Sequence, residues 1–138
     1  MRKLLVLGIC LVAVNYASSA QTTIEKIAGT WIEIPNRGES ITEKVAWSFY
    51  TDGSGRTTSS NGQRYGCSTE ENFNFTITGD SIRIISGLWK RTCIDKNKSI
   101  GGEDLEKTTT SVPPPHTMFI KLDGLNKLRL GSNDLKKE

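Results

Sequence analysis

The sequence predicts a small all-β domain, an antiparallel up-and-down meander of about eight short strands that closes into a barrel. Three observations predict it. Short segments alternate apolar and polar residues, as strands with one buried face do. Turn residues, including an Asp-Gly pair, separate these segments. No segment of the mature chain predicts a long helix. Because each strand has one apolar face and follows its neighbour in order, we expect a barrel, which leaves no exposed edge.

The first twenty residues predict an export signal that is not part of this fold. Arg2 and Lys3 supply a positive start, and the apolar run 4–14 that follows is too short to span a bilayer. Small residues at 17–20 form a cleavage site, so we expect one barrel domain over residues 21–138. No other segment is apolar enough to cross a membrane. The sequence therefore predicts a periplasmic or secreted protein with no membrane span.

The charge of the mature chain favours no nucleic-acid partner. The full chain has 18 Lys and Arg against 15 Asp and Glu, and Arg2 and Lys3 belong to the signal. Removing these two residues leaves 16 basic residues against 15 acidic ones, a net charge of +1. A basic patch large enough to hold a polyanion is not expected from such a balance.

The first half of the domain holds the clearest strands. Residues 27–34 form the first, and residues 45–50 the second, with Val45, Trp47 and Phe49 on one face. The Asp-Gly turn at 51–55 leads into a polar strand over 56–60, extending toward 65.

The second half continues the same hairpin order. Phe73, Phe75 and Ile77 share a face, and residues 78–81 form a turn into Ile82 and Ile84. Ser86 and Gly87 predict another turn before a strand over 88–94. The last two strands are expected at 117–122 and 127–130, followed by a charged, fraying tail. The predicted inward residues are Trp31, Val45, Trp47, Phe49, Phe73, Phe75, Ile77, Ile82, Ile84, Met118, Ile120, Leu122, Leu128 and Leu130.

Between these strands, residues 95–116 predict a long loop. The segment is rich in Gly, Thr and charge, shows no apolar alternation, and ends in three prolines before His116. A connection of about 20 residues in a compact domain is usually functional or disordered.

Cys67 and Cys93 remain after the signal is removed, and an even number in an exported chain predicts a disulfide. In a simple meander, however, these two positions fall at opposite ends of the sheet, whereas a disulfide requires Cα atoms within about 7 Å. Three alternatives stay open: a loop crosses over, the strand assignment is wrong near one cysteine, or the thiols are separate.

The pattern Gly29-Thr30-Trp31, then 47–55, then 73–82, resembles that of lipocalins and of the short bacterial lipocalin-like domains. The resemblance covers most of the mature chain and implies a β-barrel that binds a small molecule. It also implies structural roles for Gly29 and Trp31 at the closed end of the barrel. In the larger lipocalins an Arg on the last strand packs on this tryptophan, and Arg129 is the corresponding candidate, through a cation–π contact.

Aromatic side chains give the candidate binding site. Val45, Trp47, Phe49, Phe73 and Phe75 share the predicted inner face, and small-molecule sites are mostly apolar. The alternative is that these rings only fill the core, because an eight-stranded barrel is just wide enough for its own side chains. Core packing is the favoured interpretation for Trp31, and also for Trp47 and Phe49.

No residue pattern predicts catalysis, a cofactor or a metal site. His116 is the only histidine and has no ligand or nucleophile partner in the pattern. Residues 95–106 place oxygen ligands like a calcium loop, but Ile100 stands where that loop requires Gly, so a solvated loop is expected. The sequence therefore leaves two hypotheses: an exported non-enzymatic protein that binds a hydrophobic small molecule in its barrel, or a protein-interaction module that contacts an unidentified protein through residues 95–116.

Overall fold

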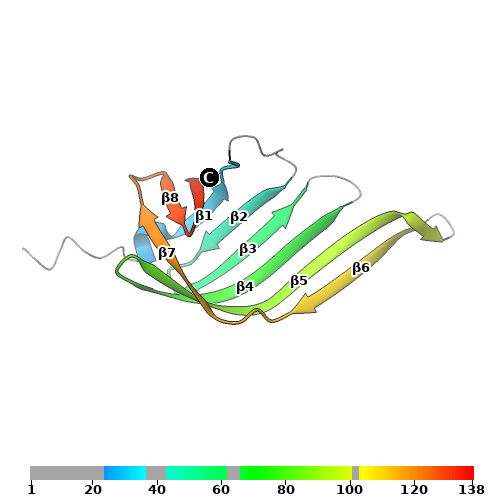
Figure 1. Ribbon diagram of the computed structural model, residues 1–138, viewed down its shortest axis with the longest axis horizontal. Helices are drawn as coiled ribbons and strands as arrows, with labels where there is room; N and C mark the ends of the chain where they lie inside the picture. Colours follow the sequence, from blue (N-terminus) through cyan, green and yellow to red (C-terminus); the bar gives the residue numbers. More distant parts are fainter. Residues whose placement is uncertain (1–23, 37–42, 62–65, 101–102) are drawn as a thin grey trace, which may run out of the picture.

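The computed structural model describes residues 24–36, 43–61, 66–100 and 103–138, and the predicted export signal lies outside them. Its elements form one antiparallel sheet preceded by a single helical turn (Figure 1). In chain order they are α2 (Ile24–Ile27), β1 (Gly29–Glu33), β2 (Lys44–Phe49), β3 (Ser54–Ser60), β4 (Cys67–Thr78), β5 (Ser81–Ile100), β6 (Glu103–Ser111), β7 (His116–Leu122), β8 (Lys127–Leu130) and β9 (Asn133–Lys137).

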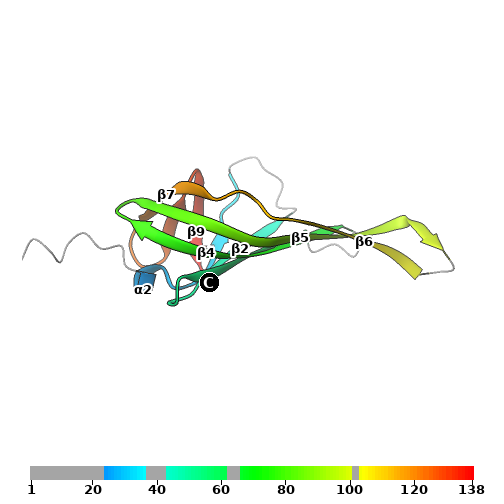
Figure 2. The same cartoon turned by 90° about the horizontal axis from the view of Figure 1, so that it is seen from below.

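Eight of the nine strands close into a barrel. The sheet runs β4-β3-β2-β1-β9-β8-β7-β5, and β5 pairs with β4 to complete the circle. The sixth strand, β6, pairs with β5 outside this circle, and the two extend away from the barrel as a narrow ribbon (Figures 1 and 2). The predicted all-β antiparallel barrel of about eight strands is therefore confirmed. Among the described residues, no helix combines the length and apolar character that a bilayer span needs.

The barrel is filled by the apolar faces of its strands. The side chains on the inner face that are almost completely buried are Ile27, Trp31, Phe49, Phe73, Phe75, Ile82, Ile84, Ile120, Leu128, Leu130 and Leu135. At one end, α2 places Ile27 under the barrel, and the indole Nε1 of Trp31 donates to the Ile27 carbonyl at 2.7 Å. This bond satisfies the one polar group of a fully buried tryptophan. We call this end the closed end and the opposite end, toward Glu33, the mouth.

At the closed end, the backbone conformation of Gly29 favours glycine. Arg129 does not have the role there that the resemblance implied. Gly29 has a φ of 125°, which other residues rarely adopt. The cation over the Trp31 ring is Lys137, whose Nζ lies 5.3 Å from the ring centroid. Arg129 points outward and pairs with Asp134 at 3.7 Å, so the prediction that it covers Trp31 is wrong.

Lys137 reaches the Trp31 ring because residues 133–137 form a ninth strand, which the sequence did not predict. Residues predicted as a fraying tail form β9, which pairs with β1 and β8 and so closes the barrel. Its register sets Lys137 opposite Trp31. Only Leu135 of β9 is fully buried, and one apolar residue in a charged segment gives no visible alternation.

The predicted turn at Ser86–Gly87 is wrong. One 20-residue strand, β5, runs through it and pairs along the whole length of β4. The register shifts there: Phe73 pairs with Ser86, but Glu71 pairs with Trp89, so β5 carries one extra residue opposite Asn72. This β-bulge keeps Ser86 and Trp89 on the same face although they are three residues apart.

Merging the two predicted strands removes the difficulty with the cysteines. Cys67 begins β4 and lies directly opposite Cys93 on β5, its hairpin partner, with the Cα atoms 4.0 Å apart. The two form a disulfide, which confirms the predicted pair and shows that the strand assignment was the error. A disulfide is typical of proteins in oxidising compartments.

The predicted long loop over residues 95–116 is also wrong. Most of it is strand: β5 continues to Ile100, and β6 returns antiparallel from Glu103 to Ser111. Residues 105–111 are all exposed, so neither face of β6 is buried against a core. A strand without a buried face needs no apolar alternation, and this is why the sequence pattern did not reveal it.

Candidate functional site

The structure brings the five predicted ligand-binding residues together on the inner face of β2 and β4. Phe49 packs on Phe75 with ring centroids 5.3 Å apart and on Phe73 at 5.9 Å. Trp47 lies 5.8 Å from Phe73 and stacks on Phe49 at 6.3 Å. The Phe73 ring also covers Gly55, where a Cβ atom would come within 2.3 Å of it. The aromatic cluster therefore forms one packed unit.

Burial divides this cluster into two parts. Phe49, Phe73 and Phe75 are between 1% and 3% exposed, so they belong to the core of the barrel. Val45 and Trp47 are only partly buried and lie nearer the mouth. Only the mouth end of the cluster therefore presents apolar surface to a ligand from solvent.

A carboxylate at the mouth fixes the orientation of Trp47. Its indole Nε1 donates to Glu33 Oε1 at 2.7 Å, and the Asn133 side-chain amide donates to the same oxygen at 3.2 Å. Glu33 was not among the residues predicted for the site. The signal was present in the alternation, because residues 29, 31 and 33 of β1 share a face.

Polar side chains continue the inner face beside Trp47. Cross-strand pairs link Trp47 to Thr57, Thr57 to Glu71, and Glu71 to Trp89, and side chains of directly opposed residues share a face. We call these four residues the mouth row. Within it, Thr57 Oγ1 is buried and has no hydrogen-bond partner among the described residues. An unsatisfied buried hydroxyl is costly, so this atom favours a polar group arriving from outside the chain.

In the next cross-strand row toward solvent, the side-chain hydroxyls already have hydrogen-bond partners. Ser59 Oγ lies 2.7 Å from Thr69 Oγ1 and donates to Glu43 Oε1 at 2.6 Å. These side-chain hydrogen bonds join Glu43, the residue before β2, to β3 and β4 at the mouth. Thr57 Oγ1 in the mouth row and Ser86 Oγ, whose residue lies opposite Phe73, are the buried side-chain polar atoms that lack a hydrogen-bond partner among the described residues.

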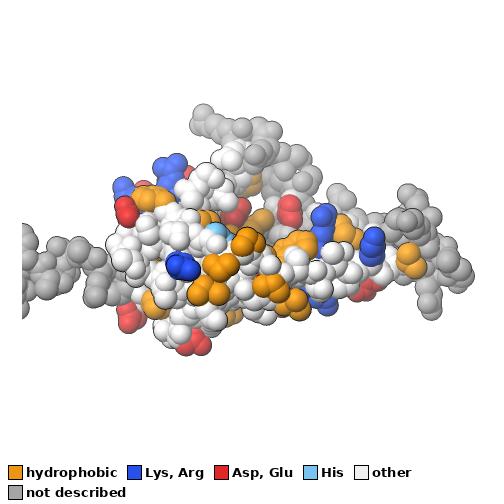
Figure 3. Space-filling view, turned by 60° about the horizontal axis from the view of Figure 1, so that its bottom comes forward, with side chains coloured by type: hydrophobic (Ala, Val, Ile, Leu, Met, Phe, Trp, Pro, Cys, Tyr) orange, Lys and Arg blue, Asp and Glu red, His pale blue; other side chains and the backbone are white. Residues whose placement is uncertain are grey.

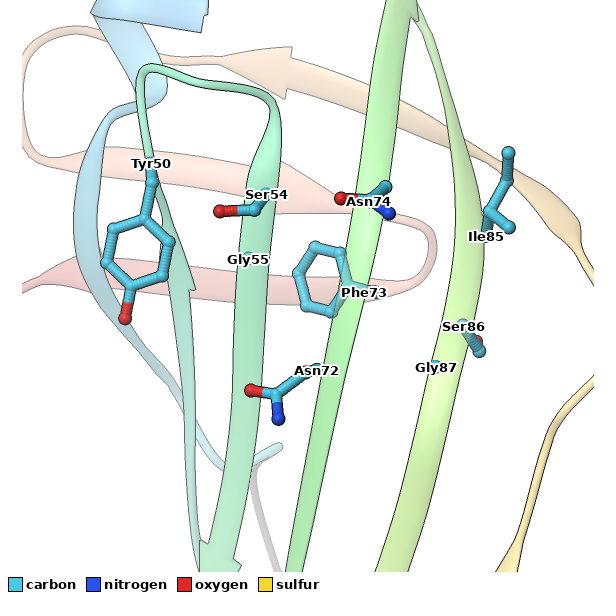
Figure 4. A pocket seen from close by; sticks show the side chains of 9 residues that line it. All are labelled: Tyr50, Ser54, Gly55, Asn72, Phe73, Asn74, Ile85, Ser86 and Gly87. Atoms are coloured by element: carbon cyan, nitrogen blue, oxygen red, sulfur yellow. The ribbon is translucent and has the colours of Figure 1, made fainter.

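A second concave site lies on the outer face of the sheet. It is a groove of about 370 Å³ that crosses the strands β3, β4 and β5, bounded by Tyr50 on one side and Ile85 on the other (Figure 4). Ser54, Gly55, Asn72, Phe73, Asn74, Ser86 and Gly87 complete its lining. The groove is open to solvent, and no sequence motif marked it, because its lining mixes polar residues, glycines and isolated apolar residues from separate strands.

The turn beside this groove contains Asp52, a carboxyl group with a lowered pKa. Asp52 accepts hydrogen bonds from the Ser54 hydroxyl at 2.6 Å and from the Ser54 amide at 2.8 Å. These bonds stabilise the carboxylate and hold the pKa of Asp52 below its ordinary value. The carboxylate is fully exposed and occupied by its own turn, so we assign it a structural role.

Exposed apolar side chains gather where β5 changes partner from β7 to β6. Ile85 and Leu88 are exposed on β5, and Val112 is exposed just after β6 (Figure 3 shows how hydrophobic side chains cluster on one face). The ladder places them close together, because Ile84 pairs with His116 and Trp89 pairs with Ser111.

The candidate metal and histidine sites receive no support. Of the segment 95–106, residues 95–100 and 103–106 belong to the paired strands β5 and β6, whereas a calcium loop coordinates from an irregular backbone. His116 is exposed, with its Nδ1 3.4 Å from the Pro114 carbonyl oxygen. In the part of the chain that the structure describes, no three His, Cys, Asp or Glu side chains are grouped to hold a metal ion.

Comparisons of the chain with protein-family models, curated proteins and solved structures found no match. The resemblance to lipocalins therefore stays a prediction, and any function must be argued from the geometry of this barrel.

Proposed function

We propose that this protein is an exported, non-catalytic binding protein that holds an apolar small molecule at the mouth of its barrel. The observation that carries the proposal is the partial burial of Trp47 at the mouth end of a packed aromatic cluster. A tryptophan whose indole N–H is already bound to Glu33 offers its ring face to a ligand without losing a hydrogen bond. Val45 extends the apolar surface on the same strand.

The mouth row adds a requirement for one polar group on the ligand. Thr57 is the cross-strand neighbour of Trp47, and its buried hydroxyl lacks a partner among the described residues. Small-molecule sites commonly combine apolar walls with a few polar groups that fix orientation. The ligand we infer therefore has an apolar body for Trp47 and Val45 and a hydrogen-bonding group for Thr57 or Glu71.

This proposal changes the roles of three of the predicted residues. Phe49, Phe73 and Phe75 support the site from below as core residues, and the ligand contacts come from Val45, Trp47 and the mouth row. The distinction matters for experiment, because core variants are expected to change stability while mouth variants change binding.

Titration with the apolar fluorescent probe N-phenyl-1-naphthylamine tests the proposal. We expect probe emission to rise on binding, and the variant Trp47→Leu to reduce probe affinity at least tenfold without unfolding the barrel. The matched control is Tyr50→Leu, which removes an aromatic side chain from the outer groove and should leave affinity unchanged. Loss of binding in the Tyr50 variant alone would place the site in the outer groove and refute the mouth.

A second candidate is a protein contact through the ribbon of β5 and β6. The observation that favours it is the free edge of β6, which pairs on one side only in the described sheet. Unpaired strand edges accept strands from other chains. Deletion of residues 97–110 should abolish capture of any partner from extracts of the source organism, and unchanged capture would exclude the ribbon as the contact.

A further inference from the structure

The outer edge of β6 is unpaired in the described sheet. In the order of the described strands, every strand except β6 has a neighbour on both sides. The residues 105–111 are all exposed, and the ribbon extends beyond the barrel, so nothing described covers its free edge (Figures 1 and 2).

The hydrogen bonds of β5 show which backbone groups of β6 are free. The Ile94 amide donates to the Gly66 carbonyl at 2.9 Å, so Ile94 directs its polar groups toward β4. Because backbone groups alternate along a strand, Cys93 directs its own toward β6, where its partner is Lys107. The alternate residues of β6 must then present their N–H and C=O groups at the open edge: Glu106, Thr108 and Thr110.

We propose that these groups pair with the same groups of a second copy of the chain, antiparallel about a two-fold axis at Thr108. An isologous strand pair must place one residue opposite itself. Centring on Glu106 or Lys107 would oppose like charges, which is destabilising. Centring on Thr108 opposes Thr108 to itself and sets Glu106 against Thr110 of the copy.

The same register also pairs the other residues of the strand without placing like charges opposite each other. It sets Lys107 against Thr109 of the copy and Leu105 against Ser111 of the copy, so the whole of 105–111 pairs without a like-charge contact. Three pairs would be directly hydrogen-bonded, giving about six backbone bonds at two per pair. No other centre pairs every residue of this stretch.

The side chains of the outer face support self-pairing in particular. Ser68, Thr92 and Thr108 form one cross-strand row, and the Thr92 and Thr108 hydroxyls lie 3.4 Å apart. The two-fold axis would continue this row into the copy, Thr108 against Thr108. Threonine pairs of this kind stabilise neighbouring strands. This inference rests on the ribbon candidate above and is independent of the ligand proposal.

Sedimentation equilibrium of the mature protein with its disulfide intact tests the dimer. We expect a reversible monomer–dimer equilibrium, and Thr108→Pro should abolish the dimer because it removes an amide of the open edge. Pro is tolerated on edge strands, and an unchanged circular-dichroism spectrum would verify that the barrel is retained. A wild-type protein that stays monomeric at every concentration would overturn the proposal, even if ribbon deletion still removed another partner in the capture experiment.

Cysteine cross-linking tests the register. Thr108→Cys should give a covalent dimer on mild oxidation, with the Cys67–Cys93 bond verified by peptide mapping. Thr110→Cys is the matched control, because Thr110 and its own copy would lie about 13 Å apart along the strands. Cross-linking at 110, or absence of cross-linking at 108 in a dimer, would overturn the pairing about Thr108.

Discussion

The division between core and mouth residues makes a quantitative prediction for Phe49. Its side chain is 1% exposed and touches three other rings at centroid distances of 5.3–6.3 Å. Replacing a buried Phe by Ala removes its transfer free energy and leaves a cavity, which together cost about 3–5 kcal/mol. Because the rings around Phe49 come from two strands of a closed barrel, we expect little collapse into the cavity and a value in the upper part of this range.

Urea unfolding followed by circular dichroism measures this loss. We expect Phe49→Ala to lower the midpoint with an unchanged denaturant slope, because the surface exposed on unfolding is nearly the same. The exposed control Ile85→Ala should change stability by no more than about 0.5 kcal/mol. Trp47→Leu, at a partly buried position, should cost under about 2 kcal/mol.

A small effect would refute the reasoning. If Phe49→Ala cost less than about 1.5 kcal/mol and also weakened probe binding, Phe49 would line a ligand cavity instead of belonging to the core. The barrel would then be hollow below Trp47, as the sequence resemblance first implied.

Three further predictions follow from other contacts. Replacing Cys67 and Cys93 by Ser should lower the free energy of unfolding by about 3.5 kcal/mol, the chain-entropy value for their separation of 26 residues, and urea titrations with and without reductant would measure it. Lys137→Met should cost about 0.5–1 kcal/mol through the lost cation–π contact, whereas Arg129→Met should shift the thermal midpoint less; the reverse order would restore the original assignment. The lowered pKa of Asp52 means that its turn stabilises the fold above the ordinary value of 3.8 and loses this contribution as pH falls through the lower folded pKa, so Asp52→Asn should reduce the thermal midpoint at neutral pH but not in strong acid.

Local patterns were sufficient wherever one face of a strand is buried and the other exposed. Val45, Trp47 and Phe49 alternate with polar or small residues, so the period predicted both the strand and its inner face. The Asp-Gly turn likewise predicted the hairpin between β2 and β3. These segments depend only on near neighbours in the chain.

Sequence patterns failed where the structure depends on a contact between residues distant in the chain, or where both faces of a strand are exposed to solvent. The identity of the cation over Trp31 depends on how β9 closes against β1, and that register is set by the whole barrel. The long β5 was divided because Ser86 and Gly87 look like a turn, although here they precede a bulge. The ribbon of β5 and β6 carries no alternation, since its described residues do not pack on a core.

The candidate site was likewise predicted only in part. The sequence predicted which aromatic residues share a face, but not which of them solvent reaches, because burial depends on the depth of each residue in the closed barrel. The alternation of β1 places Glu33 on the face of Trp31, but its hydrogen bond to Trp47, like the pairing of Thr57 with Trp47, is a cross-strand contact that no local pattern predicts.

The central claim, a ligand held on Trp47 at the mouth, is tested most directly by a nitrogen–proton correlation spectrum recorded during titration with N-phenyl-1-naphthylamine. This spectrum resolves the indole N–H groups of the tryptophans and the side-chain amides of Asn72 and Asn74. Our account predicts that the Trp47 indole signal moves with probe concentration while the signal of the fully buried Trp31 stays fixed. Movement of the Asn72 and Asn74 amide signals with a stationary Trp47 would place the ligand in the outer groove and contradict the account.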